Sequence, residues 1–179
     1  DEISGEVLEK VENNVRGDVY EKTLKSMSLC SFISLMFRKE FIDEEKMLDL
    51  TSEEYPSDWY YINKLTRKYV VDYVPKHLFE IRSNHQYERM SKKTVLSRAD
   101  ALKRIRFHMQ FIRDNREGFR LYPKSKLIHL SSIIGLCGIS GQLSIAFKCF
   151  IKGIWISPLD LNLYRKILGA MYRIIQSWI

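Results

Sequence analysis

Cysteine, proline and glycine are scarce in this chain of 179 residues, which holds 3 Cys, 4 Pro and 8 Gly. The cysteines (Cys30, Cys137 and Cys149) are odd in number, far apart and set among apolar residues. They predict buried free thiols rather than a disulfide framework, and with them an intracellular location, cytoplasmic or nuclear. So few prolines and glycines exclude a collagen-like chain and argue against long low-complexity segments.

Recognisable catalytic and metal-binding motifs are also lacking. The four histidines (His77, His85, His108 and His129) and the three cysteines include no pair at the spacing of metal ligands. No glycine-rich phosphate loop, dinucleotide-binding fingerprint or nucleophile elbow occurs. We therefore expect no metal, no cofactor and no catalytic residue, and we interpret the chain as a binding protein rather than an enzyme.

Acidic residues are concentrated in the first third of the chain. Residues 1–58 hold 7 Lys and Arg against 15 Asp and Glu, a net charge of −8. Residues 59–126 hold 17 against 6, a net charge of +11, and residues 127–179 hold 5 against 1, a net charge of +4. We expect a single helical domain over 1–179, with an acidic N-terminal part, a basic middle and a hydrophobic C-terminal part. The chain opens with Asp1 rather than Met, which leaves open whether it is a whole protein or a piece of a larger one.

One long stretch lacks formal charge altogether. It covers residues 127–147, LIHLSSIIGLCGISGQLSIAF, and its 21 residues are enough to span a bilayer as a helix. Its polar residues lower its hydrophobicity, and amphipathic segments elsewhere need an apolar partner, so we place it in a protein core. Gly135, Gly138 and Gly141 interrupt it, and helix interiors disfavour glycine by about 1 kcal/mol each. We therefore predict two helical segments that meet near 138–141.

Helical periodicity dominates the rest of the chain and predicts an all-α fold. We expect a compact bundle of about six or seven helices around a central hydrophobic helix or helix pair at 127–156. At most a minor β element is expected, near 78–84 or 119–122. The other expected helices cover 3–13, 19–41, 58–74, 98–116 and 158–179.

Capping residues mark the ends of two of these helices. Ser97, with Asp100 three residues later, predicts the start of one helix, and Gly118 predicts its end. Ser157 followed by Pro158 predicts the start of the last helix, because proline is favoured at the first helical position.

The basic middle of the chain is the strongest functional indication. Clustered Lys and Arg bind phosphates because binding releases condensed counterions, and nearby tyrosines, with His85, are suited to stacking on exposed bases. We predict a basic face that contacts RNA or another polyanion. The alternatives are an acidic protein surface, membrane headgroups, or a solvated face paired with the acidic N-terminal part. The predicted phosphate-binding residues are Lys92, Lys93, Arg98, Lys103, Arg104, Arg106, Arg113, Arg116, Arg120, Lys124 and Lys126, and the predicted stacking residues are Tyr60, Tyr61, Tyr69, Tyr73 and Tyr87.

A short segment of the apolar stretch resembles a known family. The residues Leu130–Cys137, LSSIIGLC, are similar to the central-helix segment of poxvirus Bcl-2-like proteins. The resemblance implies an all-α protein-interaction domain that binds host signalling proteins without catalysis, through an apolar groove around the central helix. A helical accessory subdomain of a larger enzyme is a third reading that the sequence leaves open.

Overall fold

The computed structural model describes residues 15–26, 36–44, 57–74 and 96–176. These residues form eight α-helices and no strand, so the prediction of an all-α bundle is confirmed. One isolated antiparallel bridge joins Gly17 to Val71. The helices are α1 (Tyr20–Lys25), α2 (Lys39–Glu44), α3 (Ser57–Thr66), α4 (Arg98–Asp114), α5 (Arg116–Leu121), α6 (Pro123–Ser140), α7 (Leu143–Ile156) and α8 (Leu161–Gln176).

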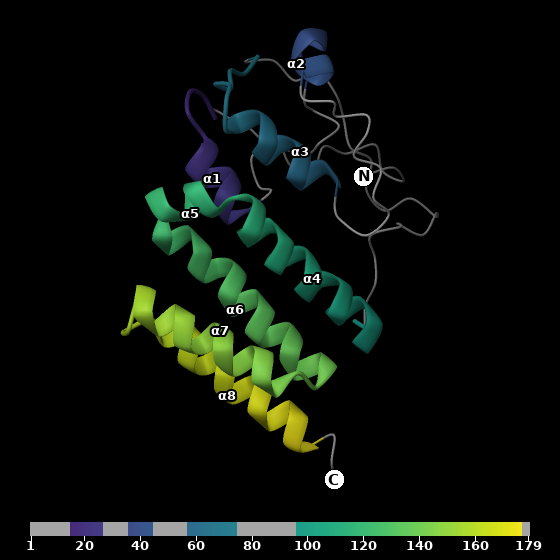
Figure 1. Ribbon diagram of the computed structural model, residues 1–179, viewed down its shortest axis with the longest axis vertical. Helices are drawn as coiled ribbons and strands as arrows, with labels where there is room; N and C mark the ends of the chain where they lie inside the picture. Colours follow the sequence, from purple (N-terminus) through teal and green to yellow (C-terminus); the bar gives the residue numbers. More distant parts are fainter. Residues whose placement is uncertain (1–14, 27–35, 45–56, 75–95, 177–179) are drawn as a thin grey trace, which may run out of the picture.

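Helix α6 is the centre of the bundle. It packs against α4 on one side and against α7 and α8 on the other, while α1, α3 and α5 gather at one end (Figure 1). Its apolar residues are buried in the main core, as the prediction of a central hydrophobic pair at 127–156 requires. Within the described part of the chain, none of the helices combines the length and the apolarity needed to cross a membrane. The buried residues that α6 gives to this core are Leu127, Leu130, Ile133, Ile134 and Cys137.

A tight turn joins α6 to α7, as the glycine cluster predicts. Gly141 has a positive φ of 75°, and its backbone N–H donates to the carbonyl of Cys137. A left-handed residue of this kind ends a helix at little cost only when it is glycine. The prediction of two helical segments meeting near 138–141 is therefore confirmed.

Helix α4 begins as predicted and ends earlier than predicted. The Ser97 hydroxyl accepts a hydrogen bond from the backbone N–H of Asp100 at 3.1 Å, which is the expected N-cap. The helix ends at Asp114, and Gly118 lies inside α5 instead of ending α4. There it leaves room for the ring of Tyr20, which a Cβ would overlap. Residues 119–122, one of the two places where a β element was expected, belong to α5 and its C-cap.

The predicted helix over 19–41 is wrong as one continuous helix: it is interrupted at Ser26, residues 27–35 lie outside the described residues, and residues 39–41 belong to α2. Helix α1 ends at Lys25, and Ser26 is extended. Two carbonyls that a longer helix would use internally are occupied by side chains from elsewhere in the fold. The indole N–H of Trp59 donates to the carbonyl of Thr23 at 2.7 Å, and His129 Nε2 lies 2.7 Å from the carbonyl oxygen of Leu24. Tertiary hydrogen bonds therefore occupy two carbonyl groups at the end of α1.

Helix α3 also ends before its predicted limit near residue 74. It stops at Thr66, whose hydroxyl lies 2.8 Å from that of Thr23 and joins α3 to α1. Further along, the backbone N–H and carbonyl of Val71 pair with those of Gly17 at 2.9 and 2.7 Å. An extended segment that pairs in this way cannot continue a helix.

The last helix begins three residues later than predicted. The backbone N–H of Ser157 donates to the carbonyl of Gly153 and ends α7, and Ser157 is not the N-cap of α8, which begins at Leu161. Asp160 takes that role, because its carboxylate accepts from the N–H groups of Asn162 and Leu163 at 2.9 and 3.4 Å. The expected helix at 3–13 and the alternative β element near 78–84 lie outside the described residues.

Candidate interaction surface

The basic residues predicted to bind phosphate are spread over three helices. Lys103, Arg106 and Arg113 recur at helical spacing on the exposed side of α4, whereas Arg104 lies near His108 and helps to lower the pKa of that histidine. Lys92 and Lys93 lie outside the described residues. The exposed members of the set are Arg98, Lys103, Arg104, Arg106, Arg113, Arg116, Arg120 and Lys124, and Lys126 is half-buried.

Three cations from different helices come close together at one end of α6. Burial lowers the pKa of the Lys126 ammonium, and the charges of Lys152 on α7 and Arg116 on α5 lower it further. Lys152 is not among the sequence-predicted residues. The fold therefore brings together like charges that are 10 and 26 residues apart in the sequence.

The predicted stacking tyrosines take part in contacts within the protein. The Tyr60 hydroxyl donates to the Asp114 carboxylate at 3.2 Å, and its ring packs against the aromatic core. The ring of Tyr69 stacks on Phe41 with a centroid distance of 3.9 Å. Tyr73 is exposed, Tyr61 is half-buried, and Tyr87 and His85 lie outside the described residues.

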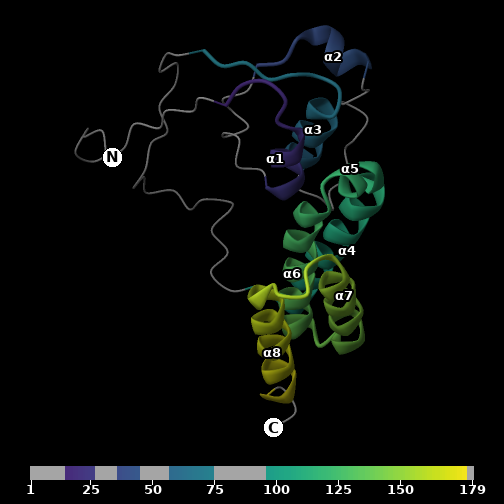
Figure 2. The ribbon, with the colours of Figure 1, turned by 90° about the vertical axis from the view of Figure 1, so that its left-hand side faces the viewer.

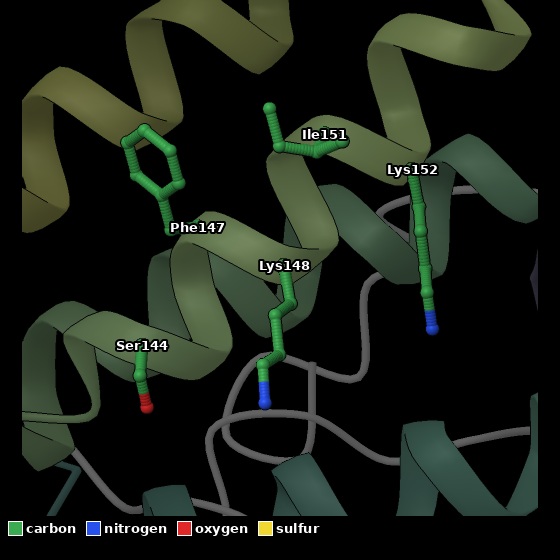
Figure 3. A pocket seen from close by; sticks show the side chains of 5 residues that line it. All are labelled: Ser144, Phe147, Lys148, Ile151 and Lys152. Atoms are coloured by element: carbon green, nitrogen blue, oxygen red, sulfur yellow. The ribbon is translucent and has the colours of Figure 1, made fainter.

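Helix α7 has an exposed apolar stripe that sequence reasoning did not single out. Leu143, Phe147, Ile151 and Trp155 recur at intervals of four residues and are all exposed. Figure 3 shows that Phe147 and Ile151 point to one side of α7 and that the polar residues Ser144, Lys148 and Lys152 point to the other. The five residues labelled there line an open hollow of about 520 Å³. Helix α7 is therefore amphipathic across its exposed surface.

Helix α8 continues this apolar surface. Its buried residues are Leu163, Ile167, Ala170 and Ile174, and a second apolar stripe beside them is exposed. The rings of Phe147, Phe150 and Tyr164 connect the two helices, with centroid distances of 6.3 and 5.3 Å between successive rings. We call the combined surface the α7–α8 face, which comprises Leu143, Phe147, Ile151 and Trp155 of α7, Tyr164, Leu168, Met171 and Ile175 of α8, and the connecting residues Leu159 and Leu161.

The turn between α7 and α8 carries the most exposed apolar side chains of the described residues. Trp155, Leu159 and Leu161 are 86%, 88% and 80% exposed. The Tyr164 hydroxyl donates to the carbonyl of Pro158 at 2.8 Å and holds the turn against α8. We call these three apolar residues the apolar tip.

The charges of α6, α7 and α8 are almost all positive. Among residues 123–176, the only carboxylate side chain is that of Asp160, which caps α8. Exposed apolar surface and unopposed positive charge therefore coincide on the same helices. The basic residues of this part of the chain are Lys124, Lys126, Lys148, Lys152, Arg165, Lys166 and Arg173.

The fold also creates a histidine pair that the sequence does not indicate. His108 Nδ1 on α4 lies 3.0 Å from His129 Nδ1 on α6, inside a group of aromatic rings that includes Trp59, Phe107 and Phe111. Burial lowers the pKa of each histidine to about 4. Residues 21 positions apart on two helices have no local spacing signal, which is why sequence reasoning missed the pair.

The hydrogen bonds determine which ring nitrogen carries the hydrogen in each histidine of this neutral pair. His129 Nε2 faces the Leu24 carbonyl, which only accepts, so Nε2 carries the hydrogen. The Nδ1 of neutral His129 must then accept a hydrogen bond from His108 Nδ1–H. The pair therefore forms a chain from His108 through His129 to Leu24, and it joins α4, α6 and α1.

The other chemically distinctive groups are buried thiols. Cys137 and Cys149 are free and buried, and burial raises the pKa of the Cys137 thiol to about 12. A thiol with so high a pKa is a poor nucleophile at neutral pH. In the described ranges, no three His, Cys, Asp or Glu side chains gather where they could hold a metal ion.

Comparison with known proteins finds no match to the chain among protein-family models, curated proteins or solved structures. The segment Leu130–Cys137 lies in α6, the central helix of the bundle. The geometry of the surface is therefore the basis for assigning a role.

Proposed function

We propose that this protein is a non-enzymatic helical binding module that docks through the α7–α8 face. One observation carries the proposal: two packed helices each have an exposed apolar stripe, ring contacts connect these helices, and the segment that contains them has several basic residues and a single carboxylate. Large exposed apolar patches on a soluble domain mark interaction sites. The positive border selects a partner surface that is both apolar and anionic.

The interior of the protein supports a binding role rather than a catalytic one. The histidine pair is hydrogen-bonded to the backbone of α1, and the two thiols are buried with raised pKa values. These groups serve packing, and the thiols suit an intracellular, reducing compartment. The exposed surface is therefore where the function is to be sought.

A panel of four defined probes tests the proposal: neutral vesicles, anionic vesicles, a single-stranded RNA and an acidic amphipathic peptide. Ile151 on α7 and Met109 on α4 are 43% and 44% exposed, so Ile151→Ser and Met109→Ser are a matched pair. We expect binding to at least one probe, weakened about tenfold by Ile151→Ser because an apolar contact is lost, and unchanged by Met109→Ser.

Thermal melting of both variants is the control for folding, since each residue is substantially exposed and should be replaceable without loss of stability. The proposal is wrong if every interaction detected in the panel is insensitive to Ile151→Ser. It is also wrong if no probe binds at low ionic strength.

The cations around Lys126 favour a second candidate, the binding of RNA or another extended polyanion. Arg116, Lys126 and Lys152 lie close enough for their charges to lower the pKa of Lys126, and a bound phosphate would relieve that repulsion.

A salt titration of RNA affinity tests this candidate. Arg116→Glu should weaken binding and reduce the slope of log affinity against log salt by about 1, because one phosphate contact is lost. Lys103→Glu, on the exposed side of α4, tells whether the row of cations on that helix contributes as well. Absence of RNA binding at low salt would exclude the candidate.

A further inference from the structure

We infer that the surface recognised by the α7–α8 face is an anionic lipid bilayer, on which the protein lies without spanning it. This inference rests on the proposed function and names its partner. An interfacial membrane site combines apolar side chains that enter the acyl boundary with cations that stay at the headgroups. Both components are present on α7 and α8.

The arrangement of side chains around α7 suits a helix lying in the plane of a membrane. The side chains of Phe147 and Ile151 project from one side of the helix, and those of Lys148 and Lys152 project from the other (Figure 3). Long lysine side chains can reach lipid phosphates while the apolar side enters the bilayer. Helix α8 packs beside α7 (Figure 2), so the apolar surface is two helices wide.

The apolar tip gives this surface a protruding anchor. Trp155 is at the C-terminal end of α7, and tryptophan favours the membrane interface because its ring is large, apolar and carries one polar N–H. Leu159 lies in the following turn, and Leu161 is the first residue of α8; both are highly exposed. The carboxylate of Asp160 between them accepts hydrogen bonds from two backbone N–H groups of α8, which offsets its repulsion by anionic headgroups.

Two other occupants fit this surface less well. A second copy of the chain would bring the same basic border against itself, and like charges across an interface oppose association. An acidic amphipathic helix needs a long concave apolar groove, whereas the open hollow of this face is lined by α7 residues alone and the most exposed apolar residues lie beyond it at one end. A broad anionic bilayer matches both the positive charge and the high exposure of these apolar residues.

Co-sedimentation with vesicles tests the inference. Vesicles of phosphatidylcholine alone are compared with vesicles of phosphatidylcholine and phosphatidylserine, using the full chain. We expect binding that favours the anionic vesicles. Ile151→Ser and Trp155→Ser should each weaken binding about tenfold, and Met109→Ser should leave it unchanged.

Charge reversal separates the electrostatic contribution to vesicle binding from the apolar contribution. The double variant Lys148→Glu/Lys152→Glu should lose at least about fivefold in affinity per lysine for anionic vesicles and lose the preference over neutral ones. Lys103→Glu, on the opposite side of the bundle, should retain that preference. A second readout is the quenching of tryptophan fluorescence by lipids brominated on their acyl chains, which should be strong in the unaltered protein and reduced in Trp155→Phe, where Trp59 and Trp178 remain.

The outcomes distinguish the membrane inference from the proposed function. Failure to sediment with either vesicle type overturns the membrane inference. If the acidic peptide then binds and Ile151→Ser abolishes its binding, the proposed function stands with a protein partner. RNA binding that is unaffected by Ile151→Ser, without vesicle binding, overturns both.

Discussion

Asp160 determines where α8 begins. Ser157 and Pro158 have the sequence pattern of a helix start, but the fold uses Ser157 to end α7 and forms a turn in which Asp160 N–H donates to the Ser157 carbonyl at 3.3 Å. The Asp160 carboxylate then satisfies N–H groups in the first turn of α8. A single side chain thus sets the boundary between the turn that bears the apolar tip and the helix that follows.

We expect Asp160→Ala to lower the free energy of unfolding by about 1 kcal/mol, because the first turn of α8 loses its N-cap. Ser157→Ala should change it by less than about 0.5 kcal/mol, because the structure gives that side chain no capping role. Urea denaturation of the two variants measures both values. The opposite order would mean that α8 starts at Pro158 in solution.

Helix α6 and its neighbours depend on close approach between backbones. A Cβ at Gly138 would lie 2.8 Å from the Cα of Ala170 on α8, a distance that a methyl group cannot occupy without moving the two helices apart. Gly135, one turn earlier on the same helix, would bring a Cβ no closer than 3.7 Å to the flexible side chain of Lys166. The two glycines therefore serve different purposes.

Alanine at the two positions should have opposite effects. Gly138→Ala should destabilise the protein by about 1–3 kcal/mol, because it overpacks the contact between α6 and α8. Gly135→Ala should be neutral or stabilise it by up to about 1 kcal/mol, because alanine favours the helix. Equilibrium unfolding in urea compares them. A Gly138→Ala variant as stable as the unaltered protein would show that α8 does not approach α6 at Gly138.

At the scale of the whole molecule, the histidine pair links the central helix α6 to α1, α3 and α4. His129 on α6 bonds to the carbonyl of Leu24 on α1 and to His108 on α4, and its ring stacks against Trp59 of α3 with a centroid distance of 5.3 Å. The pair is neutral in the folded protein, because burial lowers both pKa values to about 4.

Stability should therefore fall as the pH drops from about 6.5 towards 4. In that range the unfolded histidines bind protons and the folded pair does not, so protonation favours the unfolded state, by up to about 1.4 kcal/mol per pH unit for each histidine. Urea unfolding across this pH range measures the slope.

The double variant His108→Leu/His129→Leu is the control for this slope. It should be less stable at pH 7, because the Leu24 carbonyl loses its donor, but its stability should depend less on pH. His77 and His85 are present in both proteins, so their titration cancels in the comparison. An unchanged slope would show that the two histidines bind protons in the folded protein as readily as in the unfolded chain.

Much of the architecture follows from the sequence. The apolar stretch from residue 127, the Ser97 cap and the glycine cluster near Gly141 predict the α4, α6 and α7 segments, because their signals are local. The functional surface is harder to predict. Residues 143–156 are apolar around most of the helix, and sequence periodicity cannot tell which apolar side is buried and which is exposed.

The sequence by itself determined that the protein is helical, that residues 127–156 contribute much of its main core, and that its C-terminal helices carry almost no acidic residues. Hydrophobic periodicity, helix capping and composition depend on residues that are near one another in the sequence, so they can be recognised without the structure. Only the tertiary structure decided where α1 ends, which two histidines meet, and that the apolar stripes of α7 and α8 form one exposed face. Those outcomes depend on contacts between residues distant in sequence, such as His129 with Leu24 and Phe150 with Tyr164.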